Sequence, residues 1–279
     1  MKTEQRSAIP PIRPLVFLLA LVALAAAPLS SVHAEEGSQR PVPSQAAEPV
    51  FVAPVAAPPA ASTRWKISLA NFAKADQAQP PASDGVLFVG SSTIRMWPHL
   101  STDFRQWPIL LNRGFGGSTM ADCNALAREL VIQYKPRQIL VYAGDNDLAE
   151  GRSPTDVLKS FTGFVQRVRS ELPGSRITYI SIKPSPKRLS LLSRIRDTNA
   201  LIAAYLKTLA DVRYIDVFTP MLNAEGLPRP ELFLSDRLHL NPAGYQLWQS
   251  VIASYLPAPP QPRANALAGL VAGPAAAPR

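Results

Sequence analysis

The sequence predicts an α/β protein in which helices cover both faces of a five-stranded parallel sheet. The first observation is a set of short apolar runs without polar alternation, such as Val86-Leu87-Phe88-Val89, which are typical of strands buried on both faces. The second is that longer stretches with helical spacing of apolar residues separate these runs. Because strands and helices alternate, the connections are βαβ units, and we expect a single three-layer α/β/α domain.

Each predicted strand is rich in apolar or β-branched residues, and each predicted helix repeats apolar residues every three or four positions. We expect strands at 86–89, 109–111, 138–142, 177–182 and 213–217. We expect helices over 119–133, 154–170, 190–209 and about 242–255. Asn241 as N-cap and Pro242 as first helical residue would start the last helix. Sites in such sheets gather beyond the carboxyl ends of the strands, so the loops that follow the strands are the places to search.

Proline and alanine mark the ends of this domain. Six prolines fall in residues 35–62 and six in residues 257–279, and both segments are rich in alanine. Such segments bury too little apolar surface to offset the entropy of ordering, so we expect a flexible linker at 35–62 and a disordered tail at 257–279. The stretch between them, 63–256, has the length of one domain with a substantial core.

Residues 1–34 have the pattern of a secretory signal peptide. Lys2, Arg6 and Arg13 precede an apolar run, and Val32-His33-Ala34 places small residues at the usual cleavage positions. The apolar run is short for a membrane span. We therefore expect an exported, periplasmic or secreted protein without stable membrane insertion after cleavage; an uncleaved anchor is the alternative.

The net charge and the cysteine content bear on nucleic-acid binding and on disulfide formation. The formal net charge is +9, and cleavage after Ala34 would remove three basic residues and one acidic residue, leaving +7. No run interleaves basic and aromatic residues, so we do not expect nucleic-acid binding. Cys123 is the single cysteine of the chain, which excludes an intramolecular disulfide, and we expect it to be buried.

A serine and a histidine stand out as candidates for nucleophilic catalysis. Ser92 follows the first predicted strand at a strand-to-helix turn, where free N–H groups favour a developing negative charge; an ordinary helix N-cap is the alternative. A serine nucleophile needs a base. His99 lies on the next helix or its end, where we expect a surface residue. His239 lies in the loop before the last helix, and Asp236 three residues earlier can hold its imidazole, as in a Ser-His-Asp triad.

Two further loops could supply hydrogen-bond donors to an oxyanion. Residues 112–119 follow the second strand with several glycines, and residues 142–147 follow the third strand and contain Asn146, whose amide can donate. A glycine-rich loop could instead hold a phosphate, although no P-loop or GxGxxG pattern is present. Asp145 and Asp147 could bind a cation, but two carboxylates make a poor metal site.

These four segments, in this order, resemble the sequence blocks of the SGNH or GDSL hydrolase superfamily, in the branch related to platelet-activating-factor acetylhydrolases. The resemblance covers residues from about Val86 to Trp248 and implies a flavodoxin-like fold. It implies Ser92 as nucleophile, Asp236 and His239 as its partners, and an oxyanion hole of the Ser92 N–H, Gly117 and Asn146. The middle residue of the family's Gly-Asp-Ser triplet is Ser91 here, so we expect altered hydrogen bonding in that loop.

The sequence therefore predicts an exported serine ester hydrolase that works through an acyl-enzyme and needs no cofactor or metal. The resemblance favours small, acetyl-like acyl groups, on a small molecule, a carbohydrate or a lipid. Two alternatives stay open. A binding module for envelope glycans could keep the fold without catalysis, and an O-acyltransferase could pass the acyl group from the same serine to a sugar hydroxyl.

Overall fold

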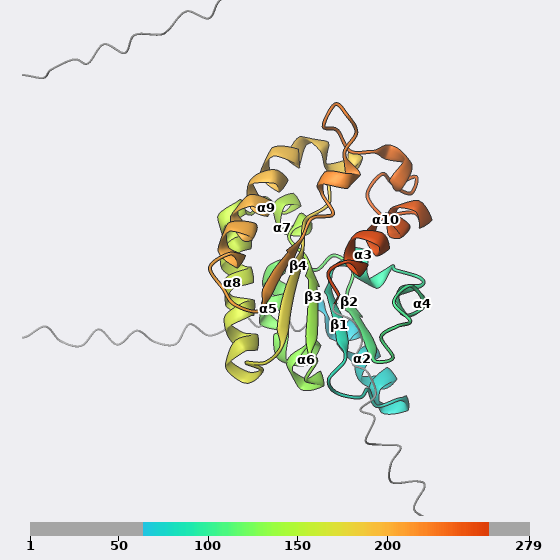
Figure 1. Ribbon diagram of the computed structural model, residues 1–279, viewed down its shortest axis with the longest axis vertical. Coiled ribbons are helices and arrows are strands. Elements are labelled where there is room, and N and C mark those ends of the chain that lie inside the picture. The colour runs from blue at the N-terminus through green and yellow to red at the C-terminus, as the bar shows by residue number, and fades with distance from the viewer. Residues whose placement is uncertain (1–63, 257–279) are drawn as a thin grey trace, which may run out of the picture. The chain divides into compact units, whose positions relative to one another are not determined.

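A computed structural model describes residues 64–256, and the expected signal peptide, linker and tail lie outside this range. Five parallel strands form one sheet in the order β2-β1-β3-β4-β5, with helices on both sides (Figure 1). The strands are β1 (Val86–Gly90), β2 (Leu110–Gly114), β3 (Gln138–Tyr142), β4 (Arg176–Ile180) and β5 (Val212–Ile215). This arrangement confirms the α/β fold predicted from the sequence.

The register brings the ends of the central strands together. Gly90 pairs with both Gly114 and Tyr142, so β1, β2 and β3 end at the same level. All five residues of β1 and of β3 are buried, which explains why these two strands have continuous apolar runs. The loops that leave this edge are those that contain Ser92, Gly117 and Asn146.

Side chains alternate across the sheet and so build two separate hydrophobic cores. Leu87 and Val89 of β1 belong to one core, which α5 (Met120–Ala125), α8 (Pro154–Glu171) and α9 (Leu192–Leu206) cover. Val86 and Phe88 belong to the other, which includes residues of α3 (Ser92–Arg95), α4 (Leu100–Asp103) and α10 (Pro242–Ala253). Cys123 is fully buried in the first core, as expected. Segments that are distant in the sequence are thus held on both faces of the sheet.

Two predicted helices differ from the observed ones. The stretch 119–133 is divided into α5, α6 (Ala127–Leu130) and the 3-10 turn η1 (Ile132–Tyr134), with Leu126 and Val131 non-helical at the breaks. The stretch 190–209 begins with the 3-10 turn η2 (Pro186–Leu191) and becomes the α-helix α9 at Leu192. The apolar spacing is the same on both sides of such breaks, so it does not reveal them. The shorter elements are α7 (Asp145–Ala149), η3 (Thr219–Met221) and η4 (Pro230–Leu232).

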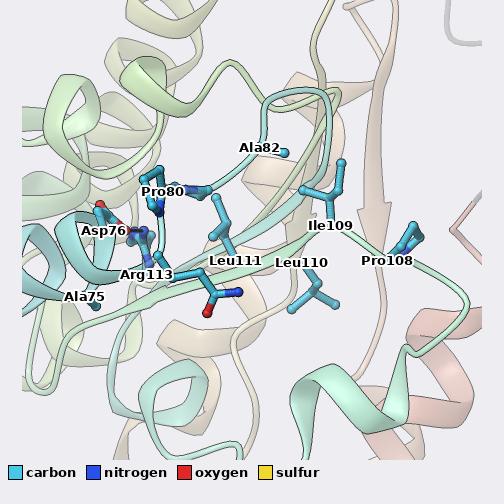
Figure 2. A pocket seen from close by; sticks show the side chains of 11 residues that line it. Ala75, Asp76, Pro80, Ala82, Pro108, Ile109, Leu110, Leu111 and Arg113 are labelled. Atoms are coloured by element: carbon cyan, nitrogen blue, oxygen red, sulfur yellow. Dashed lines mark hydrogen bonds and ion pairs between the residues drawn. The ribbon is translucent and has the colours of Figure 1, made fainter.

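One helix was not predicted. Helix α2 (Lys66–Ala78) has no fully buried residue and packs beside the sheet edge through a polar contact. Asp76 pairs with Arg113 and accepts a 2.6 Å hydrogen bond from the Tyr134 hydroxyl. A surface hollow of about 420 Å³ lies between the end of α2 and β2, beside Ile109 and Arg113 (Figure 2). None of the residues predicted for catalysis lines this hollow.

Within residues 64–256, no helix combines the length and apolarity needed to cross a bilayer.

Candidate active site

Ser92 lies at a turn whose backbone conformation is fixed by Gly90 and Ser91. Gly90 has a φ of +143°, and a Cβ there would come within 1.8 Å of the Tyr142 carbonyl oxygen, so only glycine fits. The Ser91 N–H donates to that same carbonyl at 3.0 Å. The chain then turns into α3 at Ser92, which leaves the Ser92 side chain half-buried at the end of β1.

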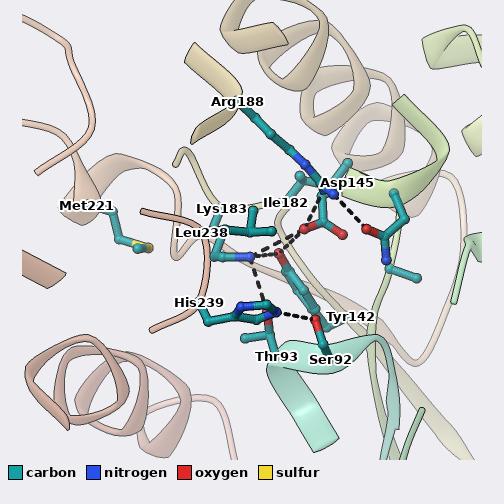
Figure 3. A network of polar contacts seen from close by, with 12 residues as sticks. Ser92, Thr93, Tyr142, Asp145, Ile182, Lys183, Arg188, Met221, Leu238 and His239 are labelled. Atoms are coloured by element: carbon teal, nitrogen blue, oxygen red, sulfur yellow. Dashed lines mark hydrogen bonds and ion pairs between the residues drawn. The ribbon is translucent and has the colours of Figure 1, made fainter. Parts of the chain in front are cut away.

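The structure brings His239 to this serine across 147 positions of sequence. His239 Nε2 lies 3.0 Å from Ser92 Oγ (Figure 3). Its Nδ1 lies 2.6 Å from Asp236 Oδ2. The other carboxylate oxygen of Asp236 accepts hydrogen bonds from the backbone N–H groups of Leu238 and His239. Since Arg237 in between has a φ of +60°, the segment makes a tight turn around the carboxylate.

The start of α10 anchors the same loop. Asn241 caps the helix by accepting from the Gly244 N–H at 3.0 Å, and its amide donates to the carbonyls of Glu231 and Phe233. Its backbone N–H donates to the Leu232 carbonyl. The expected helix start at Asn241-Pro242 is confirmed, and it holds the histidine loop against η4.

The charge on Asp236 is secured by its surroundings. Partial desolvation pushes the pKa of the carboxyl upward, but the hydrogen bonds from His239 and from two backbone N–H groups outweigh it and lower the pKa to about 2. The carboxylate is therefore ionised near neutral pH. The ionised Asp236 accepts a hydrogen bond from the protonated Nδ1 of His239. In that tautomer Nε2 carries no proton, so it can accept the hydroxyl proton of Ser92.

The two donor loops lie beside the serine. Gly117 has a φ of +81°. Asn146 is the second residue of α7, and its amide nitrogen lies 2.9 Å from the Ser118 carbonyl oxygen. Within residues 64–256, the backbone N–H groups of Ser92 and Gly117 make no hydrogen bond. Unoccupied N–H groups at the carboxyl edge are suited to receive an oxyanion.

A capping box and a buried carboxylate fix these loops. Thr119 and Asp122 exchange hydrogen bonds at the start of α5, directly after Gly117 and Ser118. Asp147 accepts a 2.8 Å hydrogen bond from the Met120 N–H, so the first turn of α5 is tied to α7. Ser91 is buried, and its hydroxyl has no hydrogen-bond partner within the described range.

A buried polar network lies behind the serine, and its two cations, Lys183 and Arg188, were not predicted as site residues. The ammonium of Lys183 lies 3.0 Å from the Tyr142 hydroxyl, 3.1 Å from the Thr93 hydroxyl and 3.3 Å from Asp145 (Figure 3). Arg188 contacts Asp145 at 3.0 Å and Asn146 at 2.7 Å. In the sequence, Lys183 and Arg188 belong to a group of basic residues with Lys187, Arg194 and Arg196, and nothing in that pattern separates them from solvated charges.

The ionisation of this network follows from its pairing. Burial alone would raise the pKa of Asp145, but Lys183 and Arg188 reverse the effect and lower it below its ordinary value. Burial lowers the pKa of Lys183, and Asp145 opposes that shift. Asp145 is therefore held by two cations. In the part of the chain that the structure describes, no group of three His, Cys, Asp or Glu side chains could hold a metal ion.

Arg64 and Trp65, just before α2, also contact the glycine loop and were missed. Arg64 donates to the Gly117 carbonyl at 3.3 Å, and Trp65 packs edge-on against Phe115 with ring centroids 5.0 Å apart. No sequence pattern links them to residues some fifty positions later. His99 is exposed, as expected from its place in the sequence.

The fold has three layers, with a parallel sheet between two layers of helices. At the carboxyl edge of the sheet, a serine, a histidine and an aspartate are in contact, and this arrangement is typical of hydrolases that attack acyl groups. The particular family is identified by sequence. Residues 82–247, more than half of the chain, match the GDSL-like Lipase/Acylhydrolase family, and the chain belongs to that family. It is accordingly a carboxylic ester hydrolase.

Solved structures of the same fold support the assignment of the architecture. A GDSL-like lipase from Bacteroides thetaiotaomicron VPI-5482 is 21% identical, with a TM-score of 0.59 over 67% of this chain and 96% of the other. A protein from Streptococcus pneumonia, provisionally named a platelet activating factor, is 20% identical, with a TM-score of 0.62 over 69% and 92%. An acetylxylan esterase from Geobacillus stearothermophilus is 14% identical, with a TM-score of 0.53 over 62% and 94%. No functionally curated protein matches the sequence closely enough to count as a relative.

Proposed function

We propose that this chain is an exported serine ester hydrolase that releases small, acetyl-like acyl groups from carbohydrate or lipid through an acyl-enzyme. The observation that carries the catalytic part is the 3.0 Å separation between Ser92 Oγ and His239 Nε2. That distance lies within the range for direct proton transfer to a general base. The fold it shares with an acetylxylan esterase and the family resemblance support an acetyl-like acyl group.

The reaction would proceed in two halves. Ser92 Oγ attacks the ester carbonyl carbon while His239 Nε2 takes its proton, and Asp236 stabilises the resulting imidazolium. The N–H groups of Ser92 and Gly117 and the amide of Asn146 stabilise the oxyanion. His239 then donates the proton to the departing alkoxide. Water attacks the acyl-enzyme with His239 again as base, which releases the acid and restores Ser92.

The deciding experiment is hydrolysis of a chromogenic acetate ester by the purified protein and by Ser92→Ala. We expect the variant to lose nearly all turnover, about 10⁴-fold or more, because the residual rate of such enzymes comes from binding and the oxyanion hole alone. His99→Ala is the matched control, since the His99 side chain is exposed and takes no part in the contacts among Ser92, His239 and Asp236. Equal rates for the wild type and Ser92→Ala would disprove the proposed nucleophile.

Two further measurements address the substrate and the export. Esters of increasing acyl length should show kcat/KM falling from acetate onward; a preference for long chains would contradict an acetyl-like acyl group. The mass of the protein recovered from the periplasm or medium should correspond to a chain that starts near Glu35. A full-length mass in the membrane fraction would instead indicate the uncleaved anchor.

A further inference from the structure

Arg188 links the oxyanion amide to the buried polar network. Its side chain, only 14% exposed, comes from η2, after β4. One terminal nitrogen donates to the Asn146 side-chain oxygen at 2.7 Å, and the other lies 3.0 Å from Asp145 (Figure 3). Asn146 and Asp145 are neighbours at the start of α7, so one guanidinium binds two adjacent side chains with its two terminal nitrogens.

This contact determines which way the Asn146 carboxamide faces. The amide nitrogen donates to the Ser118 carbonyl oxygen at 2.9 Å, and the amide oxygen accepts from Arg188. Rotation of the carboxamide by half a turn would place two acceptors together at Ser118 and two donors together at Arg188. Both contacts therefore oppose rotation, and the second N–H of the amide stays available for an oxyanion.

Arg188 is in turn held by groups close to the nucleophile. Asp145, which binds its guanidinium, also binds the ammonium of Lys183, and that ammonium contacts the hydroxyl of Thr93, the residue after Ser92. Asp145 is 5% exposed and Lys183 is 2% exposed. A chain of buried charged contacts thus runs from the serine turn to the oxyanion amide.

We propose that Arg188 is a positioning residue that holds and polarises the Asn146 carboxamide as a donor of the oxyanion hole. The proposal rests on the proposed function, since it requires the oxyanion to form at Ser92. A cation that donates to the amide oxygen draws electron density from the amide, which makes the remaining N–H a stronger donor. The oxyanion carries more charge in the transition state than the ester carbonyl does, so the effect falls on kcat.

The test is a double-mutant cycle between Arg188 and Asn146. kcat and KM for a fluorogenic acetate ester are measured for the wild type, Arg188→Ala, Asn146→Ala and the double variant, with Ser92→Ala as the background rate. Titration of Ser92 with a fluorophosphonate gives the fraction of active protein in each preparation. If the alanine variant folds poorly, Arg188→Gln replaces it, because glutamine keeps much of the side-chain volume without the charge. Lys187→Ala is the matched control, since Lys187 lies on the same turn and its side chain is exposed.

We expect Arg188→Ala to lower kcat per active serine about 10-fold, a part of the ~100- to 1000-fold that removal of a whole oxyanion donor costs. KM should change by less than about threefold, and in the Asn146→Ala background the loss should shrink to about twofold or less. Arg188→Lys should recover only part of kcat, because a compact ammonium cannot make both contacts of the planar guanidinium. Lys187→Ala should match the wild type.

Several outcomes would overturn the proposal. These are an unchanged kcat in both Arg188→Ala and Arg188→Gln, a raised KM with unchanged kcat, or the same loss in the Asn146→Ala background. The failures of the two proposals are distinguishable. If Ser92→Ala retains activity, the proposed function is wrong; if Ser92→Ala is inactive while the Arg188 variants behave like the wild type, only the role of Arg188 is wrong.

Discussion

The carboxyl group of Asp147 is buried and has no ion-pair partner among the described residues. It is fully buried, one of its oxygens accepts from the Met120 N–H, and the other has no hydrogen-bond partner within the described range. Burial raises its pKa from 3.8 to about 6, although the bond from Met120 opposes the shift. A carboxyl that holds its proton more tightly when folded makes the free energy of unfolding fall as the pH rises between these two values.

We therefore predict that Asp147→Asn removes this pH dependence. The asparagine side-chain oxygen can still accept the hydrogen bond from the Met120 N–H, and it cannot ionise. The free energy of unfolding of the variant, relative to that of the wild type, should therefore rise by about 2 kcal/mol from pH 4 to pH 7. The measurement is urea unfolding of both proteins at the two pH values. Because the two proteins differ only at position 147, the contributions of all other titrating groups cancel in the difference between their free energies of unfolding. An equal difference between the proteins at pH 4 and pH 7 would contradict the raised pKa.

At the residue scale, the sequence was sufficient to predict Ser92, His239 and Asp236 as candidates, because chemistry restricts the choice. A serine nucleophile needs a base, and few histidines are available. Arg188 and Lys183 could not be found in this way. Their contacts join residues 38 to 90 positions apart, and arginines and lysines are common on helix surfaces, so no local pattern separates them from solvated charges.

At the scale of the element, helix α2 depends on a partly buried ion pair. The Arg113 guanidinium lies over the rings of Phe72 and Tyr134, at 5.1 Å and 4.4 Å from their centroids, and pairs with Asp76. The Arg113 side chain is 7% exposed. A cation in such a place is stable only while its carboxylate partner is present.

We predict that Asp76→Ala destabilises the protein by about 3 kcal/mol, because it leaves a buried guanidinium without its counter-ion. The free energy of unfolding in urea measures the loss, and faster hydrogen exchange over 66–78 would place it in α2. Lys74→Ala, on an exposed position of the same helix, should change stability by less than about 0.5 kcal/mol. A loss no larger than that of the control would show that the pair contributes little.

The elements that were predicted well are those whose burial is uniform. The third strand was predicted at its observed bounds, 138–142, because all its residues are buried, Pro136 and Arg137 precede it, and Gly144 follows soon after it. Helix α2 was missed for the opposite reason, since it buries no residue completely and is held by an ion pair to the second strand. The breaks around α6 were missed because an apolar spacing continues across a non-helical residue.

At the scale of the whole molecule, both hydrophobic cores close within residues 64–256, and the segment before β1 contributes to both stability and site. Trp65 packs on Phe115, Arg64 donates to the Gly117 carbonyl, and Asp76 neutralises Arg113. The family match, in contrast, begins at residue 82. Contacts to Gly117, Phe115 and Arg113 thus come from residues that lie outside the matched range.

We predict that a fragment of residues 63–256 hydrolyses the acetate ester with kcat/KM within about twofold of the full chain, because it retains both cores and the contacts of Arg64 and Trp65 to the loop of Phe115 and Gly117. A fragment of residues 82–256 should be less stable by about 3 kcal/mol or more, since Arg113 loses its counter-ion and Phe115 its cover. It should also lose turnover, since the Gly117 loop is no longer braced. The free energy of unfolding in urea and the kcat/KM per active Ser92 are measured for the full chain and for both fragments. Equal values for the 82–256 fragment and the full chain would show that the segment before β1 is dispensable.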